Sequence, residues 1–192
     1  MKIEPFSTRW AGVVTHWLIE EENWKSLELG VSAQKLDPIT FRNLSRQPKH
    51  EFYLYFDEKT GQPIGLVALS DINKTSKTAR LWYMLGEKEF VQKGYTAKAV
   101  NECLKQGFNE LGLTSIYVWI VKKNAKSGQV LESNFFNYIG CRRHCHPLDG
   151  TIYDRYLYDL LASEFQERNS RKPEKKKLSQ PLPMINPTIV SH

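Results

Sequence analysis

Hydrophobic positions along the chain repeat with two different periods. Apolar residues three and four apart recur in several segments, as on one face of a helix, and short aromatic or β-branched runs between polar turns predict strands. The predicted helices cover residues 8–18, 38–44, 96–111 and 127–138, with a further apolar-periodic piece around Trp24, Leu27 and Leu29. The predicted strands cover residues 52–56, 64–69, 79–85, 116–121, 142–147 and 152–160.

The ends of these elements carry start and stop signals. Asp37-Pro38 places a capping side chain before a proline at the first helical position, and Ser7-Thr8 can cap the first helix. Gly112 and Gly140 are placed to end the last two helices, and Asp149-Gly150 predicts a tight hairpin turn. The resulting order of elements predicts an α+β protein, a mixed α/β sheet with helices on its faces.

The formal charge of +6 on the 192 residues is unevenly distributed. Residues 166–192 hold six basic and two acidic residues, whereas residues 1–165 hold 21 basic and 19 acidic ones. We therefore expect one globular domain over 1–165 and a basic, proline-containing tail over 166–192. The tail is either solvated or docks Leu182–Ile185 on the body or on the partner subunit of a homodimer.

Composition excludes several classes of protein. With 41% hydrophobic and 12% aromatic residues, the chain is not collagen-like, coiled-coil or wholly disordered. Apolar runs are too short for a membrane span and the first residues lack a signal-peptide core, so we expect a cytoplasmic protein without a membrane partner. A nearly neutral domain does not favour nucleic acid. We expect Cys103, Cys141 and Cys145 to be small buried apolar groups rather than a disulfide framework.

The segment 87–97 joins a predicted strand to a predicted helix and contains one glycine, Gly94. The first turn of a helix has unpaired backbone N–H groups and the positive end of the helix dipole, which together suit a phosphate. A glycine there lets the backbone approach the anion closely. The sequence has no Gly-x-Gly-x-x-Gly and no Gly-x4-Gly-Lys-Ser/Thr, so neither a dinucleotide fold nor a P-loop is indicated.

Three segments resemble the GNAT superfamily of N-acetyltransferases. Residues 81–86 (LWYMLG) and 92–100 (QKGYTAKAV) look like its acyl-CoA loop, and residues 124–132 look like its second cofactor segment. Residues 149–158 are similar to the closing hairpin of the branch that includes ribosomal-protein N-terminal acetyltransferases. Over about residues 50–165, the resemblance implies a mostly antiparallel sheet in which strands 82–85 and 116–121 splay apart, with acetyl-CoA or another short acyl-CoA in the gap.

The resemblance also implies which residues meet this cofactor. The pantetheine amides would pair with the backbone of residues 83–85, and a backbone N–H near Leu85 would polarise the thioester carbonyl. Loop amides would hold the pyrophosphate, and Asn124 would bind the arm from the other side. The implied cofactor residues are Tyr83, Met84, Leu85, Gln92, Lys93, Gly94, Tyr95, Thr96, Ala97, Asn124 and Ser127.

Three positions depart from the family pattern. Val91 replaces the Gln or Arg that usually opens the loop, so phosphate capture would rest on backbone donors, with the Thr96 hydroxyl as a further donor. Leu131 stands where many relatives carry a tyrosine that acts as general acid. Arg80 stands where some carry a glutamate base.

Acid–base chemistry must then come from other residues. Asp71 ends the second strand on the acceptor side, His146 has a suitable pKa, and Tyr83 could donate a proton to the leaving thiolate. Each also has a structural interpretation: Asp71 can cap a turn, His146 can lie on an exposed hairpin strand, and Tyr83 can serve packing. Glu132, a further candidate on the cofactor helix, can be a solvated helix charge. The catalytic candidates are Leu85, through its backbone, and the side chains of Tyr83, Asp71 and His146.

A cluster of cysteine and histidine over residues 141–146 raises the question of a metal. His144 and His146 are two apart in a predicted strand and would share a face. Cys141 and Cys145 would lie on the opposite face, about 13 Å apart at 3.3 Å per residue. Because no other ligand pair with metal spacing occurs, we expect no metal site.

The acceptor amine is the open question. Strand residues 81–83 and the segment 145–150 are similar to transferases that acylate amino sugars carried on nucleotides, and we favour that acceptor. An aromatic wall including Trp10, Trp17, Trp24 and Phe41 could stack the base. The alternatives are acetylation of a protein N-terminus and a non-catalytic acyl-CoA-binding module. The implied substrate-binding residues are Trp82, Arg142, Arg143 and His146, with an arginine on the diphosphate.

Overall fold

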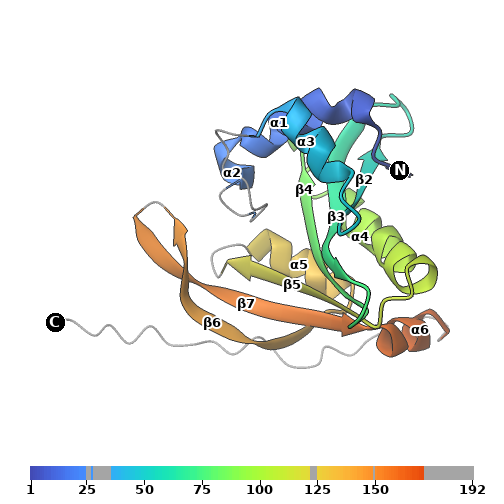
Figure 1. Cartoon of the computed structure of the whole chain (residues 1–192), viewed down its shortest axis with the longest axis vertical. Helices are drawn as coiled ribbons and strands as arrows, with labels where there is room; N and C mark the ends of the chain where they lie inside the picture. Colours follow the sequence, from blue (N-terminus) through green and yellow to red (C-terminus); the bar gives the residue numbers. More distant parts are fainter. Residues whose placement is uncertain (25–26, 28–35, 122–124, 149, 171–192) are drawn as a thin grey trace.

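A single seven-stranded sheet runs through the computed structural model, which describes residues 1–24, 27, 36–121, 125–148 and 150–170 (Figure 1). Its order is β1-β2-β3-β4-β5-β7-β6, and all neighbours pair antiparallel except β4 and β5, which are parallel. The predicted mostly antiparallel sheet is therefore confirmed. The strands are β1 (Lys2–Pro5), β2 (Glu51–Phe56), β3 (Pro63–Asn73), β4 (Thr78–Leu85), β5 (Ser115–Val121), β6 (Asn137–Leu148) and β7 (Thr151–Leu161).

Helices cover both faces of this sheet (Figure 1). We call the two sides the α1–α3 face and the α4–α5 face. No helix in the described ranges is long and apolar enough to cross a membrane. The helices are α1 (Ala11–Ile19), α2 (Glu21–Trp24), α3 (Pro38–Ser45), α4 (Tyr95–Lys105), α5 (Ala125–Ser133) and α6 (Ala162–Ser170), with short turns η1 (Thr8–Trp10), η3 (Lys88–Phe90) and η4 (Gln106–Glu110).

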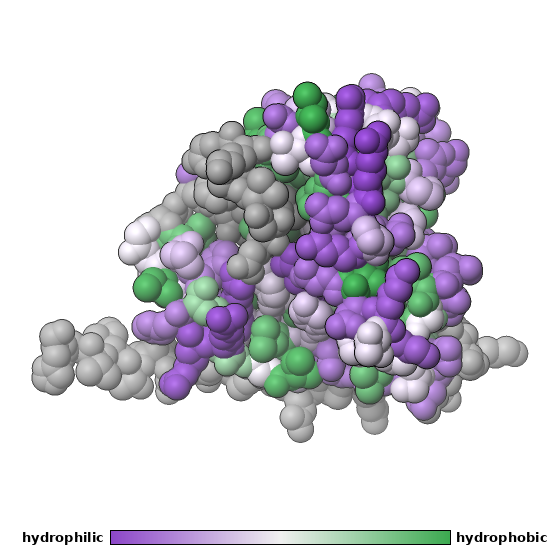
Figure 2. All heavy atoms as spheres, in the orientation of Figure 1, coloured by the Kyte–Doolittle hydropathy of each residue, from purple (hydrophilic) through white to green (hydrophobic). Residues whose placement is uncertain are grey.

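Alternate residues of the central strands pack into two separate cores. In β2, Tyr53 and Tyr55 belong to the core under α4 and α5, whereas Phe52, Leu54 and Phe56 belong to the core under α1 and α3. Because both faces are covered, β2 is buried almost throughout, which explains its continuous apolar run in the sequence. The molecular surface seen in Figure 2 is mostly hydrophilic, with hydrophobic side chains in small groups.

The sheet divides where β4 meets β5. These strands pair only over Thr78–Arg80 and Ser115–Tyr117. Beyond Arg80, β4 continues beside β3 as far as Leu85, whereas β5 continues beside β7. Figure 1 shows the two halves of the sheet diverging from this point, which confirms the expected splay.

Several sequence signals act as predicted. The Asp37 carboxylate accepts a hydrogen bond from the Thr40 backbone N–H at 2.7 Å, and Pro38 begins α3. This N–H holds the pKa of Asp37 below its usual value, because it stabilises the charged form. The Ser7 side chain, in contrast, makes no capping hydrogen bond at the start of η1.

The predicted helix 127–138 is too long. α5 ends at Ser133, and Phe135 follows with a left-handed backbone at φ 67°. Its N–H donates to the Glu132 carbonyl at 3.0 Å, and the Phe136 N–H donates to the Leu131 carbonyl at 3.1 Å. These are the two bonds of a Schellman helix end, in which glycine is usual, so a phenylalanine at the left-handed position hid the stop. β6 consequently begins at Asn137, before the predicted stop at Gly140.

Two elements were not predicted from the pattern. β1 is only four residues long and pairs with β2, so its stability comes from the neighbouring strand rather than from its own sequence. α6 runs to Ser170 and buries Phe165, which crosses the boundary that we expect at residue 165. The tail from 171 lies outside the described residues, and so does the apolar piece predicted around 24–29, except for the backbone of Trp24 at the end of α2 and for Leu27.

The cysteine prediction holds for one residue only. Cys103 is buried, whereas Cys141 is exposed and Cys145 is partly exposed. The expectation is wrong for Cys141 and Cys145 because β6 is an edge strand with mostly exposed residues, whereas helices cover the central strands on both faces.

Gly86 gives a test of the contact between the end of β4 and α1. A Cβ at this position would overlap the indole of Trp17, which is 2% exposed and cannot move aside. We expect Gly86→Ala to lower the free energy of unfolding by about 1–3 kcal/mol, measured by chemical denaturation. Gly12→Ala, in α1 with open space around its Cβ, should instead stabilise by about 0.5–1 kcal/mol. Equal effects of the two substitutions would contradict the packing argument.

Candidate active site

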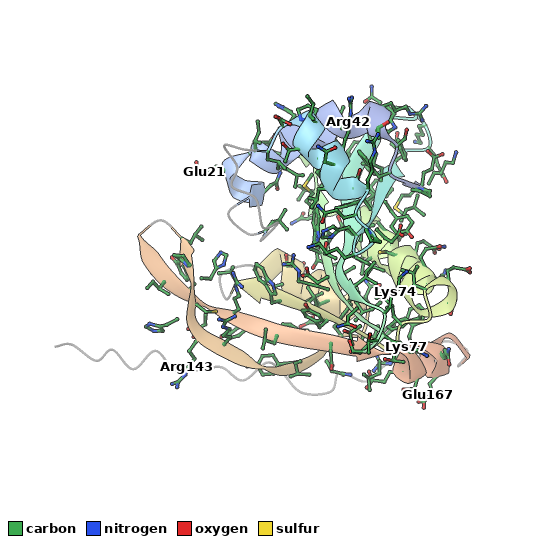
Figure 3. The ribbon with its side chains drawn as sticks, in the orientation of Figure 1. Glu21, Arg42, Lys74, Lys77, Arg143 and Glu167 are labelled. Carbon is green, nitrogen blue, oxygen red and sulfur yellow. The ribbon has the colours of Figure 1, made fainter. Side chains whose placement is uncertain are left out.

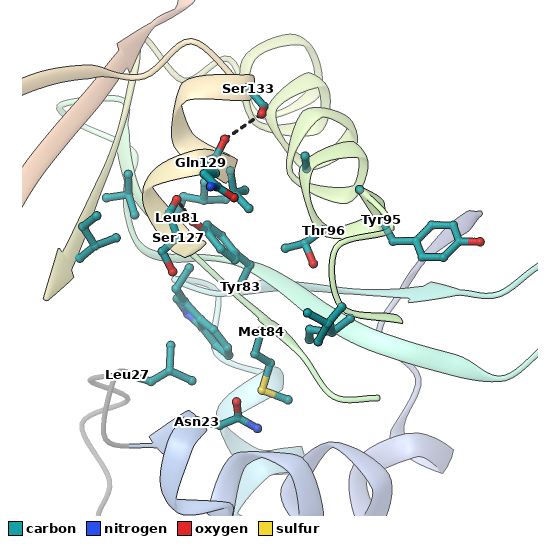
Figure 4. Close-up of a pocket in the computed structure, with 18 of the residues that line it drawn as sticks. Asn23, Leu27, Leu81, Tyr83, Met84, Tyr95, Thr96, Ser127, Gln129 and Ser133 are labelled. Carbon is teal, nitrogen blue, oxygen red and sulfur yellow. Dashed lines mark hydrogen bonds between the residues drawn. The ribbon is translucent and has the colours of Figure 1, made fainter. Parts of the chain in front are cut away.

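A cavity of about 550 Å³ lies in the divergence of β4 and β5. The end of β4, the loop from η3 to α4 and the start of α5 contribute to its wall, and Figure 4 shows Tyr83, Thr96 and Ser127 around it. It brings together most of the residues that the family resemblance implied. Those that line it are Trp82, Tyr83, Met84, Leu85, Gln92, Gly94, Tyr95, Thr96, Ala97 and Ser127.

The loop before α4 is shaped by two left-handed residues. Gly94, the N-cap of α4, has φ 73°, and Gln92 has φ 62°. The Gly94 carbonyl accepts the Lys98 N–H at 3.2 Å, which starts the helical ladder and leaves the N–H groups of the first turn as its free donors. A Cβ built at Gly94 would meet no atom within 4 Å, so the backbone here faces open space. An anion can therefore approach these donors directly.

The second feature of the cavity is a strand edge. β4 is hydrogen-bonded to β3 on one side, but its pairing with β5 stops at Arg80. The backbone of residues 82–85 thus lines the cavity with its β5-facing edge available to an extended ligand. The strand edge and the helix N-terminus together fit a long ligand with amide groups at one end and a phosphate at the other.

Tyr55 of β2 connects the strand edge of β4 to the N-terminus of α4. Its hydroxyl donates to the Met84 carbonyl at 2.8 Å and lies 3.1 Å from Thr96 Oγ1. The single phenolic proton is used on Met84, so Thr96 donates to Tyr55, and the Thr96 proton is not directed at the loop's anion site. Burial raises the pKa of Tyr55, which keeps the hydroxyl protonated. Gly65 makes the contact possible, because a Cβ there would overlap the Tyr55 hydroxyl.

Tyr83 spans the α4–α5 side of the cavity. Its hydroxyl donates to the Ser127 carbonyl at 3.1 Å, and burial raises its pKa. The phenol thus remains a proton carrier at neutral pH, close to the place where a thioester would lie. Leu131 is fully buried in the core behind it and offers no proton.

Two predicted bases lie away from the cavity wall. Asp71 is half exposed and forms an ion pair with Arg80, with 3.1 Å between Oδ2 and Nε. His146 is 5% exposed and accepts hydrogen bonds at Nδ1 from Arg155, at 3.2 Å from Nε and 2.9 Å from Nη2. An imidazole that accepts at Nδ1 carries its proton on Nε2 when neutral, so it has no lone pair left for an ammonium proton. Neither residue lines the cavity.

A bulge in β6 explains the position of His146. Four residue steps from Arg142 to His146 oppose only two steps on β7, from Arg155 to Tyr153. His144 has φ 47° at this bulge, and its N–H is held by the Asp154 carboxylate at 2.8 Å. The strand alternation is therefore broken, and the expectation that His144 and His146 share a face is wrong, since the first is exposed and the second buried.

The remaining predicted residues fall outside the cavity. Arg142 and Arg143 are exposed on edge strand β6, and Figure 3 shows Arg143 projecting away from the body. Lys93 does not line the cavity but lies 4.6 Å from the Phe90 ring, and Glu132 is exposed on α5. Asn124 and the side chain of Trp24 are not among the described parts. In the described ranges, no three His, Cys, Asp or Glu side chains are close enough to hold a metal ion.

Two members of the proposed aromatic wall, Trp17 and Phe41, belong to the core under α1 and α3, and Trp10 packs against this core. Trp17 is 2% exposed and Phe41 fully buried, and Trp82 donates its indole N–H to Ser70 Oγ at 2.7 Å. Sequence reasoning missed Trp119, which lines the cavity from β5. The signal was available: in the strand 116–121 it has the opposite parity to the core residues Ile116, Val118 and Ile120.

A divided sheet, a helix N-terminus at the end of its central strand and an open strand edge define a class of protein that binds an acylated pantetheine cofactor. Comparison with known families agrees. Residues 4–137 match the model of the acetyltransferase (GNAT) domain, and the chain belongs to this family of acetyltransferases. GNAT acetyltransferases use acetyl-CoA. The resemblance stated from the sequence is thereby confirmed.

The individual proteins that resemble this chain share less than a third of its residues. An uncharacterized N-acetyltransferase, p20 of Bacillus licheniformis, is 28% identical over 134 residues, which cover 69% of this chain and 75% of that protein. A variant of spermidine N-acetyltransferase SpeG from Vibrio cholerae superposes with a TM-score of 0.78 at 19% identity, covering 88% of this chain and all of the other. The same enzyme in complex with CoA and spermine gives 0.76 at 18% identity, covering 86% and 97%. These structures share the fold.

Removing the Tyr55 hydroxyl tests the link between strand edge and loop. In Tyr55→Phe the Met84 carbonyl and the Thr96 hydroxyl each lose a hydrogen bond to Tyr55, so we expect the free energy of unfolding to fall by about 0.5–1.5 kcal/mol. The KM for acetyl-CoA should rise more than kcat falls, because the loop and the strand edge are no longer held in register. Tyr53→Phe, two residues earlier on the same face of β2, is the control. An unchanged KM for acetyl-CoA in a folded Tyr55→Phe protein would show that the link does not serve the cofactor.

Proposed function

We propose that this acetyltransferase moves the acetyl group of acetyl-CoA to the primary amine of a small molecule by direct attack of the amine. The observation that carries the proposal is the open edge of β4 at residues 82–85 beside the Gly94 turn and the N-terminus of α4. Bound acetyl-CoA supplies an activated thioester. Because the amine attacks directly, the chain needs no covalent nucleophile. Its groups have to donate hydrogen bonds and to position the two substrates in the cavity.

The residues of the chain then have distinct roles. The backbone N–H groups of the first turn of α4 hold the pyrophosphate, and the backbone of Tyr83–Leu85 aligns the pantetheine arm. A backbone N–H near Leu85 stabilises negative charge on the carbonyl oxygen. Tyr83 keeps its proton at neutral pH, and it passes this proton to the leaving thiolate only by giving up its hydrogen bond to the Ser127 carbonyl. Since neither Asp71 nor His146 lines the cavity, the ammonium proton leaves through water rather than directly to either side chain.

The acceptor can be one of two kinds of amine. The first candidate is a nucleotide-linked amino sugar, which the sequence of strand residues 81–83 and of the segment 145–150 favours. The second is a polyamine, because the structures similar in fold include spermidine N-acetyltransferases. A protein N-terminus is a further possible acceptor. Non-catalytic binding of acyl-CoA is the alternative to an enzymatic function.

The direct test is release of CoA thiol from acetyl-CoA by the full-length protein. We expect release that depends on an added primary amine, with the acetylated product identified by mass spectrometry. The amines are glucosamine, glucosamine 6-phosphate, a nucleotide-linked amino sugar, spermidine and a peptide with a free N-terminus. Tight CoA binding without thiol release from any of them would favour the non-catalytic module.

Gly94 tests where the pyrophosphate lies. Gly94→Asp places a carboxylate against the proposed anion site, so we expect CoA binding, measured by calorimetry, to weaken by about tenfold or more, in line with the loss of charge-assisted hydrogen bonds. Gly61→Asp is a matched control, because Gly61 also has a left-handed backbone, at φ 68°, and open space around its Cβ. It lies in the turn between β2 and β3. Equal CoA affinity of the two variants would show that the loop does not hold the pyrophosphate.

A further inference from the structure

Two guanidinium groups lie against one indole ring beside the cavity. Arg155 Cζ is 3.9 Å from the centroid of the Trp119 ring, and Arg80 Cζ is 5.9 Å from it. Arg80 and Trp119 line the cavity, and Arg155 stands behind Trp119 on β7. Arg80 and Arg155 are each 8% exposed, an unusual burial for arginine. We call Arg80, Trp119 and Arg155 the arginine–tryptophan cluster.

The cluster lies on the α1–α3 face of the sheet, opposite the face that holds the proposed cofactor loop. Leu81, Tyr83 and Leu85 of β4 pack toward α4 and α5, where the cofactor loop is. Trp82 and Met84 belong to the core on the other face, and Arg80, two residues before Trp82 in β4, faces the same way. At 3.3 Å per residue, Arg80 is roughly 10 Å along the strand from Tyr83. This is a suitable distance between an amine at the thioester and a second group of the same small molecule.

Charge in and around the cluster favours an anion. Asp71 pairs with Arg80 from its half-exposed position, and His146 meets Arg155 as a neutral acceptor. Across the cavity, Lys88 has Glu20 at 3.7 Å, so that pair adds little net charge. A guanidinium carries five N–H donors in a planar fork, more than one carboxylate uses, and it keeps its charge at every working pH. An arginine already paired with Asp71 can thus still bind a phosphate or carboxylate.

We propose that the acceptor amine also carries an anionic group, a phosphate, diphosphate or carboxylate, which Arg80 binds beside Trp119. Arg155 is a positioning residue that supports the indole. This inference rests on the proposed function and names its acceptor class. A nucleotide-linked amino sugar has such a group in its diphosphate. Spermidine does not, and it would bring several positive charges to two arginines, which is unfavourable.

Matched pairs of amines test the inference in the full-length protein. The probes are glucosamine with glucosamine 6-phosphate, tyramine with tyrosine, and spermidine. We expect the member of at least one pair that carries the phosphate or carboxylate, called the anionic member, to have a kcat/KM about tenfold or more above the member that lacks it, the scale of a hydrogen bond between charged groups. The first pair reports on phosphate and the second on carboxylate. Preference for the members without the anionic group, or for spermidine, would overturn the inference while leaving the proposed function intact.

Charge variants locate the effect. Arg80→Gln should abolish the preference for the anionic member without changing the KM for acetyl-CoA, and Arg80→Lys should keep part of it. Lys74→Gln removes the same charge from the exposed turn before β4, which does not line the cavity, and should keep the full preference. Arg155→Gln should reduce the preference less than Arg80→Gln does. It provides a second measurement of the same effect if Arg80→Gln does not fold. A preference that survives both Gln variants would place the anion elsewhere and overturn the inference.

Discussion

The parallel pairing of β4 with β5 stops at Arg80, and the site depends on this interruption. The backbone of β4 beyond that residue keeps one partner strand and presents its other edge to a cavity. Unpaired strand edges are usually a liability in proteins, because they recruit other chains. Here the edge lies inside the molecule, between the two halves of the sheet, where only a ligand of the right width can reach it. The same divergence lies between the core under α4 and α5 and the core under α1 and α3.

Keeping such a strand in place requires support from elsewhere, and much of it comes from β2 and α1. The Tyr55 hydroxyl reaches over Gly65 to the Met84 carbonyl and meets Thr96 at the start of α4. On the opposite side Trp17 packs on Gly86 and donates its indole N–H to Glu87 at 3.1 Å. The position of the strand edge relative to the helix N-terminus is thus fixed by buried contacts, which lowers the entropic cost of ordering a ligand.

Most of the fold could be predicted from the sequence, since the central strands and α4 are long and strongly patterned. The errors have local causes. Phe135 occupies a left-handed position where glycine is the usual signal, and the bulge at His144 breaks the alternation on which the placement of His146 relied. β1 and α6 have weak patterns of their own and are stabilised by partners distant in the sequence.

The sequence by itself determined the family and most of the order of elements, and it predicted the cofactor segments, because those signals are local: a glycine before a helix, a strand preceding it and a capped turn. The acceptor side was decided only by the tertiary structure. Arg142 and Arg143 carry the same charge as Arg80 and Arg155, yet β6 exposes the first pair while β4 and β7 bring the second pair to one indole ring. Strand order and register decide which arginines share a site. The physical reason is that these contacts join residues 39 and 36 positions apart, which no local pattern encodes.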